Sequence, residues 1–341
     1  MEQRNVGQVP AGAAGAVAPA GADGEPYQPY TNLPASMQGL YRPKPPGKLK
    51  QALLVWAFGK GIPGIFGFLR AVAPIFHIPF TNTVILTRFD DVQEVYCRNE
   101  DFFVPYIKTC DDLKWDPAFL LALKHDDAHY RDMLRKVRLL WSDGDLDLIS
   151  RIAARVSSKA LKANKGEIDA IQNLMLPVVL HVIDEYYGIP VPGLAVHDQL
   201  GNGERKPSDL SAEEKHDIER MEAFIAGSVS MASFLFGPQN HKDKQKQDIH
   251  WACNSVWPLV YDAVNNYQRD PGENTIIGRA RRLRALSEAD GGVQITDKEL
   301  RSYLLGMIVG FLPTNTNANG RCFDVLMKRP EARQAAQEAV D

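Results

Sequence analysis

The stretch from Thr296 to Lys328 most constrains what this chain can fold into, because it reads as one long helix. Thr296 and Glu299 have the spacing of a capping box, in which the Thr hydroxyl accepts from the Glu amide and the Glu carboxylate accepts from the Thr amide. Apolar residues then recur at helical spacing, at Leu300, Leu304, Met307, Ile308 and Phe311. The pattern predicts a single capped helix near the end of the chain.

Residues that disfavour helices crowd the middle of this stretch: Gly310, Pro313, Thr314, Asn315 and Thr316. Pro313 has no N–H, so the carbonyl of Val309 loses its partner and a kink is expected. The Thr314 hydroxyl can bond the Gly310 carbonyl or point into the gap. Because Gly310 has no side chain, a bulky group can lie against the backbone there. The alternative is a packing kink in a buried helix.

Length, charge and cysteine usage exclude several classes of protein. The chain has 341 residues and a formal net charge of -3, which does not favour nucleic acid as a partner. Its cysteines, at 97, 110, 253 and 322, form no C-x-x-C pair, which indicates a reducing compartment and a cytoplasmic location. Residues 1–30 are rich in Gly, Ala and Pro, and we expect a disordered tail rather than a secretory signal there. A domain is expected over 31–341.

Residues 51–80 are unusually apolar, although Lys60, Arg70 and several Gly and Pro residues make them a poor transmembrane helix. They are interpreted either as a hydrophobic lip, which rests in peripheral contact on a membrane or lines the way in for a ligand, or as core beneath a short sheet. We favour core. A strand is predicted at 83–87, where β-branched residues gather.

Two runs of arginine stand out. Arg131, Arg135 and Arg138 share one face of a helix predicted at 125–141. This face is either solvated or a clamp for carboxylates or phosphates. The second run lies in a helix predicted at 275–286, and we interpret it as a solvated face rather than a docking patch: Arg279, Arg281, Arg282 and Arg284.

Further helices are predicted at 145–163, 166–187, 211–236 and 250–269, with a polar loop at 196–209 and a polar break at 240–248. Gly188 ends the second of these helices, and His181 on its apolar face is interpreted as a satisfied core residue rather than a metal ligand. There is no Gly-rich phosphate loop and no G-x-S-x-G. The expected fold class is mainly α, with about a dozen helices and almost no sheet.

Four stretches, in this order, resemble the cytochrome P450 family of haem-thiolate monooxygenases: FDDVQEVYCRNEDFF, HDDAHYRDMLRKVRLLW, DAIQNLMLPVVLHVIDEYYGIP and ITDKELRSYLLGMIVGFLPTNTNA. The similarity runs from about residue 83 to the last residue. It implies a cytochrome P450-like helical fold with a minor small β-sheet, and haem b as cofactor. It also implies a monooxygenase that acts on a small or medium apolar organic molecule, with electrons from a ferredoxin or flavoprotein reductase.

The resemblance also implies roles for individual residues. Arg131 and Arg135 would hold the haem propionates, and Gly310 would leave room over the porphyrin. Thr314 would lie beside bound oxygen, with Asn315 and Asn317 as further groups for proton transfer. An apolar substrate pocket would be lined by Met307, Phe311 and the segment 107–123.

Two departures from the family pattern matter. Pro313 occupies the position of an acidic residue that usually precedes the Thr, which opens the alternative of a hydroperoxide isomerase or peroxygenase that needs no reductase. The E-x-x-R helix and the Cys-containing haem loop are absent, so no proximal metal ligand is expected in this chain. The resemblance thus covers the N-terminal two-thirds of such an enzyme, an incomplete domain truncated after the long helix and inactive alone. A third alternative is a helical binding protein without haem.

Overall fold

The computed structural model describes residues 48–80, 83–98, 100–102, 104, 106–113, 115, 119–120, 123, 128–164, 168–236, 242–270, 273–290 and 293–338. The tail predicted at 1–30 lies outside these ranges. The described residues are mostly helical, and their one sheet has two strands. The mainly α fold class is therefore confirmed.

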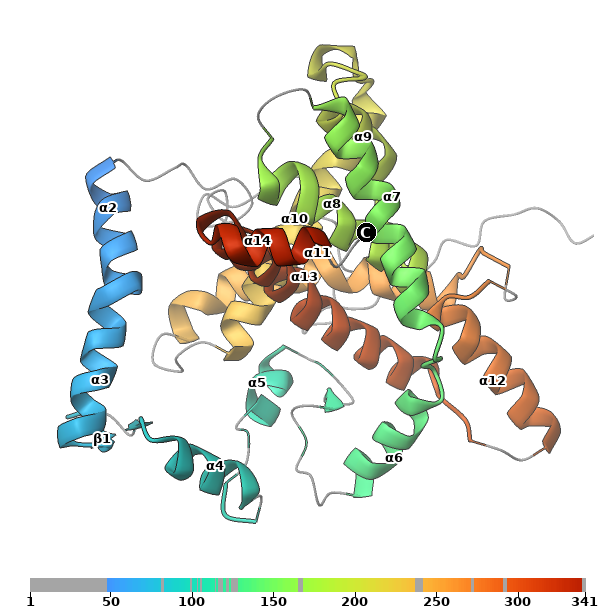
Figure 1. Ribbon diagram of the computed structural model, residues 1–341. Helices are drawn as coiled ribbons and strands as arrows, with labels where there is room; N and C mark the ends of the chain where they lie inside the picture. The colour runs from blue at the N-terminus through green and yellow to red at the C-terminus, as the bar shows by residue number, and fades with distance from the viewer. Residues whose placement is uncertain are drawn as a thin grey trace, which may run out of the picture.

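Helix α13 (Asp297–Lys328) runs through the middle of the molecule, and other helices pack around it (Figure 1). Its N-terminus has the predicted capping box: the Glu299 amide donates to Thr296 Oγ1 at 3.2 Å, and the Thr296 amide donates to Glu299 Oε2 at 2.8 Å. The helix continues through Pro313 as a single element. Residues at helical spacing, among them Leu304, Ile308 and Leu312, are buried.

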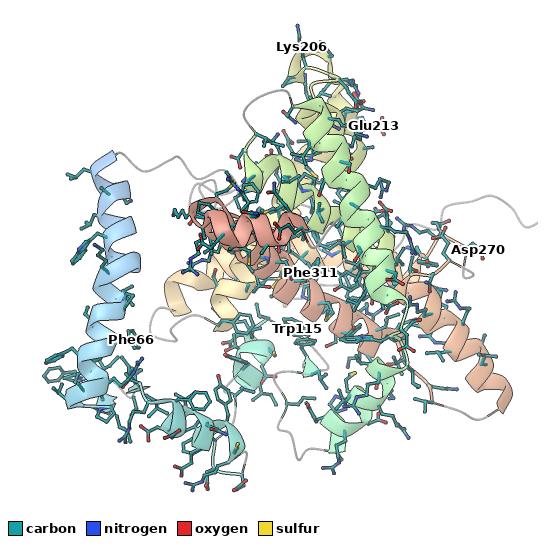
Figure 2. The ribbon with its side chains drawn as sticks, viewed as in Figure 1. Phe66, Trp115, Lys206, Glu213, Asp270 and Phe311 are labelled. Atoms are coloured by element: carbon teal, nitrogen blue, oxygen red, sulfur yellow. The ribbon has the colours of Figure 1, made fainter. Side chains whose placement is uncertain are left out.

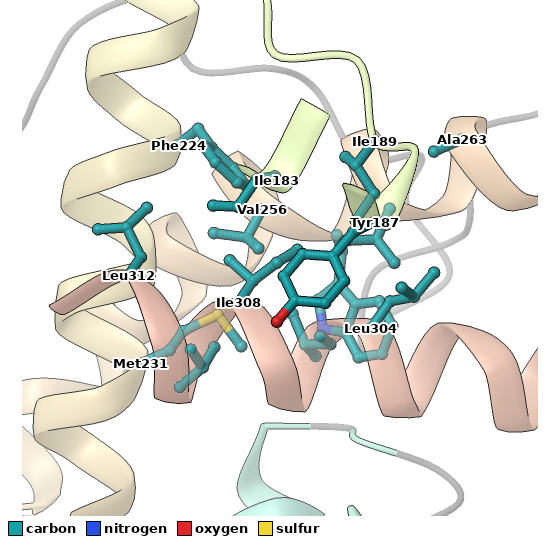
Figure 3. Packing of buried hydrophobic residues seen from close by; sticks show 14 of the residues in the cluster. Ile183, Tyr187, Ile189, Phe224, Met231, Val256, Ala263, Leu304, Ile308 and Leu312 are labelled. Atoms are coloured by element: carbon teal, nitrogen blue, oxygen red, sulfur yellow. The ribbon is translucent and has the colours of Figure 1, made fainter. Parts of the chain in front are cut away.

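The core is formed where α13 meets α10 (Ala212–Phe236) and α11 (Lys242–Asn265). Figure 3 shows Ile308 and Leu312 of α13 close to Phe224 and Met231 of α10 and Val256 of α11. Helix α11 begins inside the stretch predicted as a polar break, so that prediction was wrong. Lys, Gln and Asp can all occupy an exposed helical turn, and polarity alone does not end a helix.

A second group of elements covers another part of α13. A π-helical segment, η3 (Ala170–Met175), leads into α8 (Leu176–Val182) and a second π-helical segment, η4 (Ile183–Tyr187). Gly188 ends this run with a φ of 86°, which favours glycine, as predicted. Helix α9 (Leu194–Gly201) covers residues 196–201 of the predicted polar loop, so that prediction was wrong for this part of the loop. Leu194, which is buried, anchors this helix.

The first described elements form a rod at one edge of the molecule (Figure 1). Helix α2 (Lys48–Trp56), a π-helical turn η1 (Ala57–Gly61) and helix α3 (Ile62–Val72) lead to strand β1 (Ile75–His77), which pairs antiparallel with β2 (Val84–Leu86). The strand predicted at 83–87 is confirmed. The core interpretation of 51–80 was wrong, because α3 has no buried residue.

The remaining elements connect these groups: α4 (Phe89–Cys97), α5 (Tyr106–Asp112), α6 (Ala128–Arg138), α7 (Asp145–Ala163), the 3-10 turn η5 (Pro207–Asp209), α12 (Ile276–Asp290) and α14 (Pro330–Glu338). Helix α7 has the predicted bounds, and α6 is shorter than predicted. No helix in the described ranges is long and apolar enough to cross a membrane.

The arginines of α12 are not a solvated face, so that interpretation was wrong. Arg279 is 7% exposed and forms a bidentate ion pair with Asp145 at 2.5 and 2.9 Å. Arg281 donates to the Val264 carbonyl, Arg282 to the Glu273 carbonyl and Arg284 to the Ile295 carbonyl. These carbonyls lie where neighbouring elements end or connect and need donors, which the long arginine side chains supply.

Candidate cofactor face of the long helix

One face of α13 is open beside the buried core. Met307, Gly310 and Thr314 are spaced at i, i+3 and i+7, so they lie on one side of the helix. Thr314 is exposed, and Met307 and Gly310 are half-buried. A Cβ added at Gly310 would meet no atom of the described residues within 4 Å. We call these three residues the open face.

The other two glycines of α13 are closely packed, which singles out Gly310. A Cβ at Gly306 would lie 2.2 Å from the ring of Phe119, and a Cβ at Gly320 would lie 2.4 Å from Ile171 Cδ1. Those two positions require glycine because a neighbouring side chain fills the space. At Gly310 the space is open, so the helix backbone there is accessible to a bulky group.

The polar side chains of the next turn bond back to their own helix. Thr314 Oγ1 donates to the Gly310 carbonyl, the first of the two possibilities considered from the sequence, and Asn315 Nδ2 donates to the Phe311 carbonyl at 3.1 Å. Thr316 Oγ1 donates to the Leu312 carbonyl at 2.7 Å, and Asn317 Nδ2 to the Pro313 carbonyl at 2.9 Å. This back-bonding holds polar residues within the helix. It leaves Thr314 and Asn317 exposed and Asn315 half-buried.

Phe311 lies beside the open face but contacts the core. Its ring meets the ring of Tyr187 edge-on, with centroids 5.8 Å apart. Met307 and Phe311 are both half-buried and pack against the core cluster. They therefore form an apolar border to the open face, and their role as pocket residues stays a prediction.

Part of the segment 107–123 covers the first half of α13. The Trp115 indole N–H donates to the Ser302 carbonyl at 3.2 Å and to Ser302 Oγ at 3.0 Å. The Phe119 ring stacks on Trp115 with centroids 5.7 Å apart and occupies the space left by Gly306. Figure 2 shows Trp115 close below the ribbon of α13. Buried aromatic rings thus adjoin the turn that precedes Gly310.

The predicted arginine clamp lies on the exposed side of α6. Arg131, Arg135 and Arg138 are all exposed, while Met133 and Val137 are buried on the opposite side. Arg135 pairs with Asp132 at 3.0 Å. The structure therefore brings the three arginines together on one face, and their role in holding an anion stays a prediction.

Lys136 is a residue that the sequence analysis missed. Its Nζ donates to Glu299 at 2.6 Å and pairs with Asp132 at 2.7 Å, and its side chain is 13% exposed. Burial lowers the pKa of Lys136, but the hydrogen bonds to Asp132 and Glu299 outweigh burial and raise the pKa above its usual value. Because Glu299 also belongs to the capping box, this contact fixes α6 against the N-terminus of α13. The i, i+4 spacing of Asp132 and Lys136 was the only signal in the sequence.

A buried polar cluster supports α13 further along. Asp145 accepts from Tyr186 Oη at 2.9 Å as well as from Arg279, and Trp141 Nε1 donates to Tyr303 Oη at 2.9 Å. Burial raises the pKa of Asp145, but the hydrogen bonds from Arg279, the Ser142 amide and Tyr186 hold it below its usual value. The cluster joins α7, η4 and α12 close to α13.

The cysteines bear on whether this chain fits a haem-thiolate site. Burial raises the pKa of Cys110 to about 11 and that of Cys253 to about 12, so both are neutral thiols, whereas a metal ligand must be a thiolate. Cys97 is exposed on α4, and Cys322 is exposed on α13 itself. Among the described residues, no group of His, Cys, Asp and Glu could hold a metal ion. The backbone at Gly310 is thus accessible to a flat group, and the pKa values of Cys110 and Cys253 favour neutral thiols over metal-binding thiolates.

Comparisons with known proteins agree on the fold. The structure resembles that of cytochrome P450 CREJ in complex with (4-ethylphenyl) dihydrogen phosphate, with a TM-score of 0.56 and 20% identity over 80% of this chain. It also resembles the crystal structure of CalO2, with a TM-score of 0.53 and 18% identity over 81% of this chain. The chain spans 63% and 64% of those two proteins. No family model and no curated protein matches the sequence. The fold is therefore cytochrome P450-like, as the resemblance implied.

Proposed function

We propose that this chain belongs to a haem-dependent oxidoreductase, a monooxygenase that acts on a small or medium apolar organic molecule. The observation that carries the proposal is the open face of α13. On a cytochrome P450-like fold, the central helix exposes backbone at Gly310, with apolar side chains on one border and a hydroxyl one turn further on. A flat apolar cofactor and a small substrate need such a surface.

The chain's own residues divide into groups that bind, orient and transfer protons. Haem b, when bound, supplies the activation of oxygen. Gly310 leaves its backbone accessible, and Arg131 and Arg135 supply guanidinium groups for carboxylates. Met307 and Phe311, together with the segment 107–123, exclude water and orient an apolar substrate. The electrons would come from a ferredoxin or flavoprotein reductase.

Thr314 is proposed to hold a proton. Its hydroxyl donates to the Gly310 carbonyl and stands on the open face, so a rotation about χ1 redirects the proton away from the helix. Breaking the hydrogen bond from Thr314 to the Gly310 carbonyl costs about 1 kcal/mol, which is the net contribution of a typical hydrogen bond. Asn315 and Asn317 hold their amide groups on the next carbonyls and are the neighbouring donors.

A second candidate is a hydroperoxide isomerase or peroxygenase on the same fold. The observation that favours it is that the turn from Gly310 to Asn317 contains no carboxylate, and Pro313 stands directly before Thr314. The polar groups there are neutral, which suits cleavage of an oxygen–oxygen bond that is already present in the substrate.

Pro313→Glu separates the two candidates, with Pro313→Ala as its matched control because both variants restore the missing backbone N–H. A monooxygenase should form more product per electron consumed with Glu than with Ala, because a positioned proton donor contributes about 10²–10⁴-fold to such a step. Equal behaviour of the two variants, with turnover that needs no reductase, would favour the hydroperoxide chemistry.

The cofactor proposal is tested by the absorption spectrum of the protein after incubation with hemin. We expect a Soret band of bound haem, with Arg135→Ala lowering haem retention by about 1.5–3 kcal/mol, the range for a charge-assisted hydrogen bond. Arg151→Ala is the control, since Arg151 is an exposed arginine on α7, outside the arginine face of α6. A protein without any Soret band would instead support the third alternative, a helical binding protein.

A further inference from the structure

The rod formed by α2, η1 and α3 exposes several large apolar side chains to solvent. Its exposed large side chains, which we call the apolar face, are Leu49, Leu53, Trp56, Ile62, Ile65, Phe66, Phe68 and Val72. Figure 2 shows Phe66 on the lower part of this rod, at the edge of the molecule. Exposed fractions of 61% for Leu53, 59% for Ile65 and 64% for Phe68 are large for apolar residues. Apolar patches of this extent mark sites of interaction.

The apolar residues of α3 are confined to one side. With about 100° between successive helical residues, Ile62, Ile65, Phe66, Phe68, Leu69 and Val72 fall within an arc of about 160°. The opposite side carries Pro63, Gly64, Gly67, Arg70 and Ala71. A Cβ added at Gly64 or Gly67 would meet no atom within 4 Å, so that side is also open. Helix α3 packs mainly on η1 and β1, at its two ends.

The charged residues of the segment that contains the rod are all basic. Residues 48–89 include Lys48, Lys50, Lys60, Arg70 and Arg88, and they include no Asp or Glu. Arg88 is paired with Asp91, and Arg70 donates to the carbonyl of Thr87. Two copies of this surface related by a twofold axis would bring cations together. A partner with a negative surface potential and an apolar interior complements both properties.

We propose that α2 and α3 dock onto an anionic phospholipid bilayer, lying in the plane of its surface with the apolar face among the acyl chains. A helix with a large apolar arc, aromatic residues and basic residues binds in this way. The described helices are not long and apolar enough to cross the bilayer, which agrees with a helix that lies on it. This inference does not depend on the proposed haem chemistry.

Sedimentation with vesicles tests the docking. The chain is mixed with vesicles of phosphatidylcholine alone, or of phosphatidylcholine with about one-third phosphatidylserine, whose surface potential attracts basic segments. We expect binding to the anionic vesicles, weakened by salt. Ile65→Glu should lower the affinity for the vesicles by more than about tenfold. The substitution removes an apolar side chain that inserts into the bilayer and places a charge among the acyl chains instead.

Gly64→Glu is the matched control, because it adds the same charge at the adjacent position on the opposite side of α3. It should retain most of the binding, and circular dichroism should show both variants folded, since both positions are exposed. Equal loss of binding in the two variants would overturn the proposal that the apolar face inserts into the bilayer. It would show that binding depends on charge attraction alone. The proposal would also be overturned if the chain did not sediment with anionic vesicles. A dimer in solution that Ile65→Glu dissociates would overturn it as well, because the apolar face would then bind a second copy of the chain.

Discussion

At the scale of single residues, the buried charged side chains in the described ranges are paired with a partner from another element. Asp145 and Arg279 lie 134 positions apart in the sequence, and each is 7% exposed. Removing one partner of such a pair leaves a buried charge uncompensated and costs about 3–5 kcal/mol. The second example is His181, a titratable side chain held by two carboxylates.

His181 is held between two carboxylates. Its Nδ1 lies 2.7 Å from Glu185 Oε1, and its Nε2 lies 2.9 Å from Asp198 Oδ2, while Arg155 pairs with Glu185 from α7. Burial lowers the pKa of His181, but the hydrogen bonds to Asp198 and Glu185 outweigh burial and raise it. His181 is therefore a satisfied residue, as interpreted from the sequence.

A raised pKa in the folded state makes stability depend on pH with a definite sign. The contribution of His181 is fully present below the unfolded-state pKa of about 6.5, and it is lost as pH rises through the higher folded-state pKa. We expect the free energy of unfolding in urea to fall as pH rises above about 6.5 and through the higher folded-state pKa of His181. His181→Gln should be less stable at low pH by about 1.5–3 kcal/mol and should lose this slope. Equal slopes for the two proteins would assign the pH dependence to other groups.

At the scale of elements, local signals predicted α13 and its neighbours well. The capping box at Thr296 and Glu299 and the left-handed Gly188 involve residues close in sequence, so their geometry can be read from the chain alone. The wrong predictions concern features that are determined by residues distant in the sequence. The acceptors of Arg281 and Arg284, the start of α9 and the exposure of α3 depend on what packs nearby, and no local pattern shows that.

The glycines of α13 give an element-scale prediction. Gly306→Ala places a Cβ against the Phe119 ring and should cost about 1–3 kcal/mol, the range for overpacking. Gly310→Ala meets no atom and should stabilise the helix by about 1 kcal/mol through its higher helix propensity. Urea unfolding of the two variants beside the native chain measures both. Destabilisation by Gly310→Ala comparable with that by Gly306→Ala would show that the open face is packed.

At the scale of the whole molecule, the cytochrome P450-like fold could be predicted from the order of four motifs, although no single motif specified it. The candidate site was predicted less completely. Gly310 and the Thr314 hydrogen bond follow from helix spacing and back-bonding, which are local. Lys136 and the Trp115–Phe119 cover on α13 were missed, because contacts such as Lys136 to Glu299 span 163 positions and leave no periodic signal.

The measurement that tests the central claim most directly is a titration of the chain with hemin in the presence of imidazole, which supplies the axial ligand that these cysteines do not. The account predicts saturable binding to the native chain, and a loss of affinity of at least about tenfold in Gly310→Leu, because the leucine side chain fills the space over the helix backbone. Circular dichroism should show the variant folded, since a Cβ at Gly310 meets no atom within 4 Å. Equal affinity of the native chain and Gly310→Leu, or no binding by either, would contradict the account.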